Sequence, residues 1–171
     1  MTIKISTTFD AGAIEVVHAE NASAIELNLR KDSHADIAQW FYFRLQGARG
    51  ERCSMRILNA SDATYPDGWQ NYQAVASYDR KHWFRVPTSY DGKVMTIAHT
   101  PQYDSVYYAY FEPYSWERHL DLLARAQMSA TAQVQDLGNT VQGRDLNVVV
   151  IGDPAAQKKV LSLIHISEPR D

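Results

Sequence analysis

The chain ends with a histidine and a glutamate at a spacing that could hold a metal ion. His165, Ile166, Ser167 and Glu168 form an H-x-x-E sequence after an apolar run. A neutral imidazole and a carboxylate can share Zn²⁺ and leave a position open for a water molecule whose pKa the metal lowers. However, no third ligand is identifiable, and Pro169 would stop a following helix. We interpret the pair as a coincidence, with a surviving metal pair as the alternative.

Arg144 is the second candidate for chemistry, in the sequence Val-Gln-Gly-Arg-Asp at positions 141–145. A guanidinium suits carbonyl and carboxylate groups because it presents several donors in a fixed plane. The alternative is a solvated arginine in the turn that follows Gly143.

The other side chains that could bind or react favour structural roles. Cys53 lies in an apolar stretch, and we expect a buried, inert thiol. The remaining histidines lack the spacing of metal ligands, and we expect polar surface or hydrogen-bonded positions for them. They are His18, His34, His82, His99 and His119. One set of aromatic residues could line a binding face, but core packing is the preferred interpretation. This set is Trp40, Tyr42, Trp83, Tyr107 and Tyr110.

Length and charge narrow the class of protein. The 171 residues fit one large domain, or one domain and part of another. The formal net charge of −3 argues against a nucleic-acid partner. No apolar run is long enough to span a membrane, so we expect no membrane partner. A single cysteine cannot form an internal disulfide, which favours a cytoplasmic location.

The elements that would position these side chains change in type near residue 113. Before it, short strands are predicted. Residues 25–29 alternate between apolar and polar side chains, and an aromatic run covers 40–43. Further strands are expected near 53–57, 75–78, 83–86, 94–98 and 106–111. A hairpin turn is predicted at 90–93. This spacing predicts an antiparallel β-sandwich.

After residue 113 the sequence predicts a helix and then strands. Ser115 can cap a helix on which Trp116, Leu120 and Leu123 share one side. A strand-like stretch begins at Val134. Residues 146–151 are almost wholly apolar, as in a strand that is covered on both faces.

Several stretches together resemble the cytosolic carboxypeptidase branch of the zinc metallocarboxypeptidases. They are Phe-Asp-Ala-Gly at 9–12, LNLRKDSHADIAQWFYFRL at 27–45, MRILNA at 55–60, SYDRKHWF at 77–84, DSVYYAYFEPY at 104–114 and LGNTVQGRDL at 137–146. The resemblance covers about residues 8–160. It implies a mostly β fold: a β-sandwich domain at 1–112, followed at 113–160 by the start of an α/β zinc carboxypeptidase domain.

By this resemblance, the full-length protein would be a zinc-dependent hydrolase that removes C-terminal residues from the tail of a peptide or protein. The family's metal ligands, carboxylate-binding arginine and general base would follow Val160, where we expect a truncation. Residues 161–171 (LSLIHISEPRD) resemble the translation of a sequencing-adapter read-through, and we expect a non-native tail.

The chain is therefore predicted to contain no catalytic residue and no metal ligand, and to be inactive by itself. The resemblance gives Arg144 a role in substrate binding, as the Gly-Arg that precedes a strand in the family. The alternative is a stand-alone β-sandwich module that binds a peptide or a carbohydrate, which the aromatic residues favour.

Overall fold

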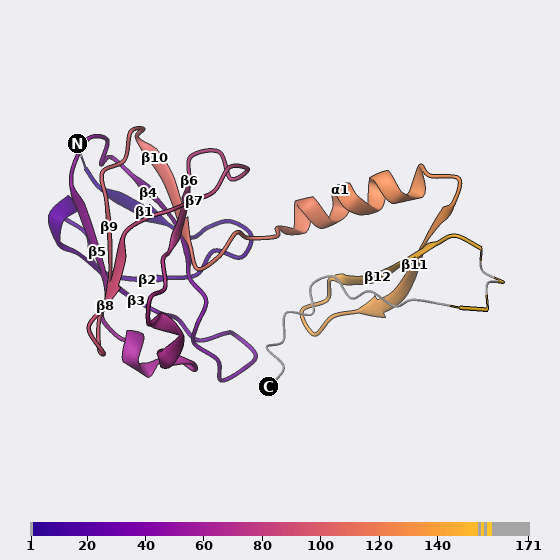
Figure 1. Ribbon diagram of the computed structural model, residues 1–171, viewed down its shortest axis with the longest axis horizontal. Helices are drawn as coiled ribbons and strands as arrows, with labels where there is room; N and C mark the ends of the chain where they lie inside the picture. Colours follow the sequence, from indigo (N-terminus) through magenta and orange to yellow (C-terminus); the bar gives the residue numbers. More distant parts are fainter. Residues whose placement is uncertain (1, 154, 156, 159–171) are drawn as a thin grey trace. The chain divides into compact units, whose positions relative to one another are not determined.

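The first sheet has five strands in the order β1-β4-β10-β6-β7, with every neighbouring pair antiparallel (Figure 1). A computed structural model describes residues 2–153, 155, 157 and 158 of the chain. The strands of this sheet are β1 (Lys4–Ser6), β4 (Tyr42–Gln46), β10 (Ser105–Ala109), β6 (Val75–Ser77) and β7 (Phe84–Arg85).

The second sheet has five strands in the order β2-β3-β5-β9-β8. The strands are β2 (Glu15–His18), β3 (Ile25–Asn28), β5 (Cys53–Ile57), β9 (Met95–His99) and β8 (Thr88–Tyr90). β3 and β5 pair in parallel, with Ile25 opposite Met55, whereas the other neighbours are antiparallel. The predicted sandwich is confirmed, with this parallel pair as a departure from a purely antiparallel arrangement.

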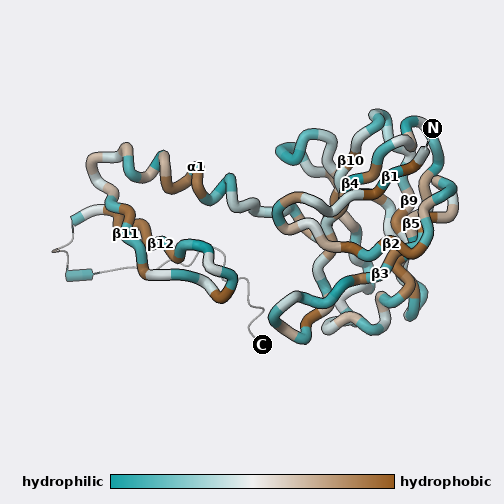
Figure 2. The backbone as a smooth tube through the Cα atoms, turned by 180° about the vertical axis from the view of Figure 1, so that it is seen from behind, coloured by the Kyte–Doolittle hydropathy of each residue, from teal (hydrophilic) through white to brown (hydrophobic). Residues whose placement is uncertain are grey.

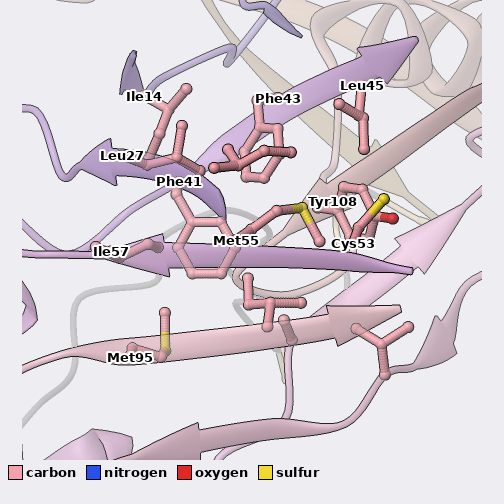
Figure 3. Packing of buried hydrophobic residues seen from close by; sticks show 14 of the residues in the cluster. Ile14, Leu27, Phe41, Phe43, Leu45, Cys53, Met55, Ile57, Met95 and Tyr108 are labelled. Carbon is pink, nitrogen blue, oxygen red and sulfur yellow. The ribbon is translucent and has the colours of Figure 1, made fainter. Parts of the chain in front are cut away.

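The core lies between the two sheets and consists largely of alternate residues of their strands, with Trp69 of a 3₁₀ helix added. Phe41, Phe43 and Leu45 point inward on and beside β4, and they belong to one buried cluster with Met55 and Tyr108 (Figure 3). Each large apolar side chain that is fully buried in this way stabilises the fold by about 1.5–3 kcal/mol relative to its exposed state. The sandwich is therefore built on residues of period two, as the sequence pattern predicts.

The aromatic run at 40–43 is extended, but the strand is shifted from its predicted position. β4 begins at Tyr42 and continues to Gln46, and Trp40 lies before it. The Trp40 indole Nε1–H donates a hydrogen bond of 2.7 Å to the Ala11 carbonyl. The Trp40 side chain therefore links the residues before β4 to the loop that contains Ala11. Three short 3₁₀ helices connect other strands, at Ala22–Ala24, Ala60–Asp62 and Pro66–Trp69.

The chain forms two compact units, Met1–Ser115 and Trp116–Asp171. The second contains helix α1 (Trp116–Gln127), which lies against β11 (Ala132–Asn139), and β11 pairs with β12 (Asp145–Ile151) in an antiparallel hairpin. The predicted helix is confirmed. No helix in the described part of the chain is long and apolar enough to cross a membrane.

β12 differs from its expected environment. Its composition predicts burial on both faces, and Figure 2 shows its hydrophobic residues, yet no residue of β12 is buried and Ile151 is 76% exposed. The physical reason is its pairing: among the described residues, β11 is the strand that pairs with it. A hairpin beside one helix covers only part of the apolar surface that such a strand presents.

Candidate functional site

Arg144 lies at the end of the turn that joins β11 to β12. The Thr140 N–H donates to the Arg144 carbonyl at 2.8 Å, and the Arg144 N–H donates to Thr140 Oγ1 at 3.1 Å. Gly143, with φ of +76°, donates its N–H to the Thr140 carbonyl at 2.8 Å. The left-handed conformation favours glycine at this position. The Gly-Arg sequence therefore sets the backbone from which the Arg144 side chain projects.

The side chain of Arg144 joins a cluster that connects three elements of the second unit. Its guanidinium carbon lies over the Trp116 ring, 5.3 Å from the ring centroid. The Trp116 ring stacks on His119, one helical turn further along α1, with centroids 5.0 Å apart and an interplanar angle of 29°. His119 Nε2 is 3.3 Å from Asn147 Oδ1 on β12.

This cluster can bind but carries no evident bond-breaking chemistry. Arg144 is an exposed residue, and its guanidinium carbon lies over the indole ring. Such an arrangement orients donors toward a carbonyl or carboxylate oxygen. The sequence singled out Arg144 but not its neighbours. Trp116 and His119 are three residues apart on a helix, and this spacing could have predicted their contact. No local sequence pattern could have predicted that Asn147 lies beside them.

The described part of the chain does not gather ligands for a metal. In residues 2–153, 155, 157 and 158, no three His, Cys, Asp or Glu side chains lie together in a group that could hold an ion. A metal site of the carboxypeptidase type needs such a set, so the described residues do not fit one, and we assign no metal-dependent step to them. His165 and Glu168 lie outside the described residues.

Cys53 is buried in the core, as predicted. Burial and the neighbouring charge of Glu51 raise the pKa of its thiol to about 11. The Sγ–H donates to the Glu51 carbonyl at 3.6 Å. A thiol that stays protonated at neutral pH is a poor nucleophile and a poor metal ligand.

The aromatic set of the sequence analysis divides between two packed clusters. Tyr42 is buried on the outer face of the first sheet with Val75 and Ala109, and Trp40, Trp83 and Tyr107 pack against them. Tyr110 packs instead against the main core between the sheets. Packing explains this set, and desolvation raises the pKa of the Tyr42 hydroxyl to about 12.

A different aromatic group lines an open pocket that the sequence pattern did not indicate. The pocket has a volume of about 510 Å³ and lies within the first unit. Its lining residues are Tyr78, Asp79, His82, Phe84, Tyr103 and Ser105. Four of them lie within 78–84, after β6 and on β7, and two lie at 103–105, at the start of β10. The fold brings these two stretches together, which no local pattern indicates.

Comparison with known proteins places these observations in a family context. The model of the cytosolic carboxypeptidase N-terminal domain matches residues 5–111. An uncharacterized protein of Zymomonas mobilis is 39% identical over 153 residues, which make up 90% of this chain and 40% of that protein.

Two solved structures resemble the chain over most of its length. A metallo-carboxypeptidase from Burkholderia cenocepacia is 56% identical with a TM-score of 0.88, and the match covers 91% of this chain and 41% of that one. A metallo-carboxypeptidase from Pseudomonas aeruginosa, in complex with (2-guanidinoethylmercapto)succinic acid, is 39% identical with a TM-score of 0.82, over 85% and 39% of the two chains. This chain therefore spans about two fifths of the length of these relatives.

Proposed function

Because the chain belongs to the family of the cytosolic carboxypeptidase N-terminal domain, we propose that it is the N-terminal part of a zinc-dependent metallocarboxypeptidase that hydrolyses C-terminal residues of peptides or proteins. The main support is the extent of the similarity to the Burkholderia cenocepacia enzyme. The similarity covers 91% of the chain. Because the first unit ends at residue 115 of 171, the similarity must continue into the second unit.

The two units would then have different roles in the whole enzyme. Residues 1–112 form the accessory β-sandwich, and residues 113–160 are the start of the α/β catalytic domain. The similarity across both units favours this assignment over a stand-alone peptide- or carbohydrate-binding module. The buried single thiol and the family of the sandwich support a cytoplasmic location.

Arg144 is the residue that we assign to substrate binding in the whole enzyme. Arg144 is an exposed residue whose guanidinium carbon lies over the Trp116 ring, and a guanidinium suits a carbonyl or carboxylate of a peptide tail. A charge-assisted hydrogen bond of this kind contributes about 1.5–3 kcal/mol. The catalytic zinc would be held by residues other than those described here, and we expect this chain to be inactive by itself.

A hybrid enzyme tests the proposed function. Residues 2–158 replace the matching N-terminal part of the Burkholderia cenocepacia protein, and the release of C-terminal amino acids from peptides is measured with and without a chelator. We expect the hybrid to release amino acids, the chelator to abolish the release, zinc to restore it, and the 171-residue chain alone to release none. An inactive, folded hybrid would contradict the proposed function, whereas chelator-sensitive release by the chain alone would contradict its inactivity.

The same hybrid tests the role of Arg144. We expect Arg144→Ala to lower kcat/KM by about 10- to 100-fold, the loss of one charge-assisted hydrogen bond. Arg125→Ala, which removes an exposed arginine near the end of α1, is the matched control. Equal kcat/KM values of the two variants would contradict a role of Arg144 in substrate binding.

A further inference from the structure

The pocket on the first unit combines exposed aromatic rings with a fixed carboxylate. Three rings form its apolar part: the Tyr78 and Tyr103 centroids are 4.9 Å apart in an edge-to-face arrangement, and the Phe84 centroid is 5.5 Å from that of Tyr78. Phe84 is 39% exposed and Tyr103 is 57% exposed, so water reaches both side chains. Exposed aromatic surface beside a hollow is a feature of binding sites rather than of packing.

The aromatic walls are held in place from behind. The Tyr78 hydroxyl accepts the Gln102 N–H at 3.0 Å, which ties that ring to the loop before β10. The Phe84 ring packs edge-to-face on His99, with centroids 5.7 Å apart. His99 Nδ1 in turn lies 2.8 Å from the hydroxyl of Tyr108, a residue of the core. The pocket is therefore largely formed before any ligand binds.

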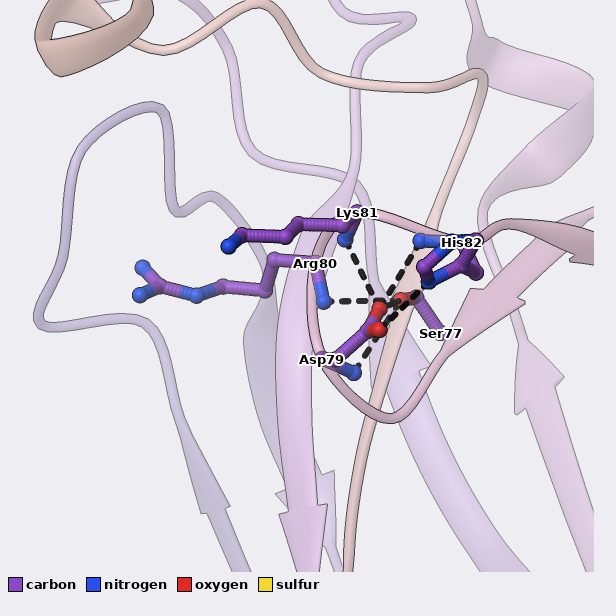
Figure 4. A network of polar contacts seen from close by, with 5 residues as sticks. All are labelled: Ser77, Asp79, Arg80, Lys81 and His82. Carbon is purple, nitrogen blue, oxygen red and sulfur yellow. Dashed lines mark hydrogen bonds and ion pairs between the residues drawn. The ribbon is translucent and has the colours of Figure 1, made fainter.

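Asp79 supplies the charge of the pocket. Its Oδ1 accepts the backbone N–H groups of Lys81 and His82, each at 2.8 Å, and its Oδ2 lies 2.6 Å from His82 Nδ1 (Figure 4). These hydrogen bonds, above all those from His82, hold the pKa of the Asp79 carboxyl well below its usual value. The carboxylate is therefore negative at neutral pH and fixed beside the rings.

The side chains of Arg80 and Lys81 do not line the pocket, whereas His82 lines it and pairs with Asp79. Figure 4 shows the side chains of Arg80 and Lys81 extending away from His82, which lines the pocket. The Arg80 guanidinium carbon lies over the Tyr107 ring instead, 5.6 Å from its centroid. Ring faces and a carboxylate attract cations and repel anions.

We propose that this pocket, formed by Tyr78, Phe84, Tyr103 and Asp79, binds the positively charged side chain of a lysine or arginine presented by a peptide. The aliphatic stem of such a side chain would lie on the exposed rings, and its cationic head would lie near Asp79. The site belongs to the sandwich and needs no metal, so it would operate independently of any hydrolytic centre.

The test uses the purified chain, isotope-labelled for NMR, and small peptide-like probes. Nα-acetyl-lysine amide and Nα-acetyl-arginine amide are titrated against Nα-acetyl-norleucine amide, which has a similar stem and no charge. We expect the two cationic probes to shift the amide signals of 78–84 and 103–105 and to bind more tightly than the norleucine probe. Shifts spread over the surface, equal binding of the uncharged probe, or tighter binding of glucose would overturn the proposal.

Variants then assign the binding to the rings. We expect Tyr103→Leu, which keeps apolar bulk and removes the ring, to weaken lysine-probe binding by about two- to fivefold. Tyr65→Leu changes an aromatic residue of similar exposure outside the pocket and should leave the binding unchanged. Phe84→Leu is a second ring variant in case Tyr103→Leu fails to fold. Unchanged affinity in the folded ring variants would overturn the proposal.

Discussion

The guanidinium of Arg144 lies over the indole ring of Trp116, 5.3 Å from the ring centroid, so the β11–β12 turn is joined to the first residue of α1. In the proposed role of Arg144, this contact would give the side chain a preferred orientation before a substrate binds. A binding residue whose side chain is already ordered loses less conformational entropy when it binds.

The energy of this contact can be measured directly. We expect a double-mutant cycle of Arg144→Ala and Trp116→Leu to give a coupling energy of about 0.5–1 kcal/mol, the range for a cation over an aromatic face at an exposed site. Chemical denaturation of the wild-type, single and double variants supplies the four free energies of unfolding. Additive effects of the two substitutions would show that the contact contributes nothing to stability.

Gly12 is required by the close approach of two backbone segments. A Cβ at this position would lie 2.2 Å from the Thr7 carbonyl oxygen, whereas a Cβ at Gly68 would meet nothing within 4 Å. We therefore expect Gly12→Ala to lower the free energy of unfolding by about 1–3 kcal/mol, and Gly68→Ala to change it far less. Thermal denaturation of both variants makes the comparison. Equal stability of the two would mean that the loop at 7–12 rearranges without cost.

The hydrogen bond between Tyr108 and His99 should contribute to the stability of the sandwich. Tyr108 is fully buried, so Tyr108→Phe removes the partner of a half-buried imidazole without changing the packing of the ring. We expect a loss of about 1 kcal/mol. Tyr107→Phe, on the other face of the same strand, is the control, and urea denaturation is the measurement. A larger loss in the Tyr107 variant would contradict this account.

The thiol of Cys53 should be unreactive in the folded chain. Its raised pKa of about 11 leaves almost no thiolate at pH 8, whereas an unfolded cysteine has a pKa of about 8.5. Burial of the neutral thiol therefore stabilises the fold fully below about pH 8.5, and this stabilisation is lost as the pH rises toward 11. We expect an aromatic disulfide reagent to react much more slowly with the native chain than with the urea-unfolded chain at pH 8.

Because Cys53 is the single cysteine of the sequence, one thiol per chain accounts for the whole signal, and Cys53→Ala should give none. Equal rates in the native and unfolded chains would show that this strand opens readily.

Local pattern predicted the strands that are buried on one face. Ile25 and Leu27 alternate with polar residues, and both are fully buried on β3. The predicted turn at 90–93 joins β8 to β9, with Asp91 Oδ1 accepting the N–H groups of Lys93 and Val94 at 2.8 and 2.7 Å. These features depend on residues close in sequence, which is why they could be predicted.

Long-range pairing could not be predicted in the same way. The parallel pairing of β3 with β5 joins Glu26 to Arg56 at 3.1 Å, across 30 residues that carry no local signal for strand direction. All four residues of β2 are exposed, so it lacks the alternation that marks a half-buried strand. The candidate site follows the same division. Arg144 was identified from its short Gly-Arg sequence, which resembles that of the family, whereas Asn147 joins the cluster only through the fold.

The position of β10 between β4 and β6 has a consequence for how the chain is made. β10 is the last strand of the sandwich to leave the ribosome, yet it supplies the partner for two strands synthesised earlier. Until residues 105–109 emerge, the edges of β4 and β6 that pair with β10 lack their partner, and the first sheet cannot be completed. The first sheet therefore completes its native pairing late in synthesis, whereas the strands of the second sheet are all available earlier.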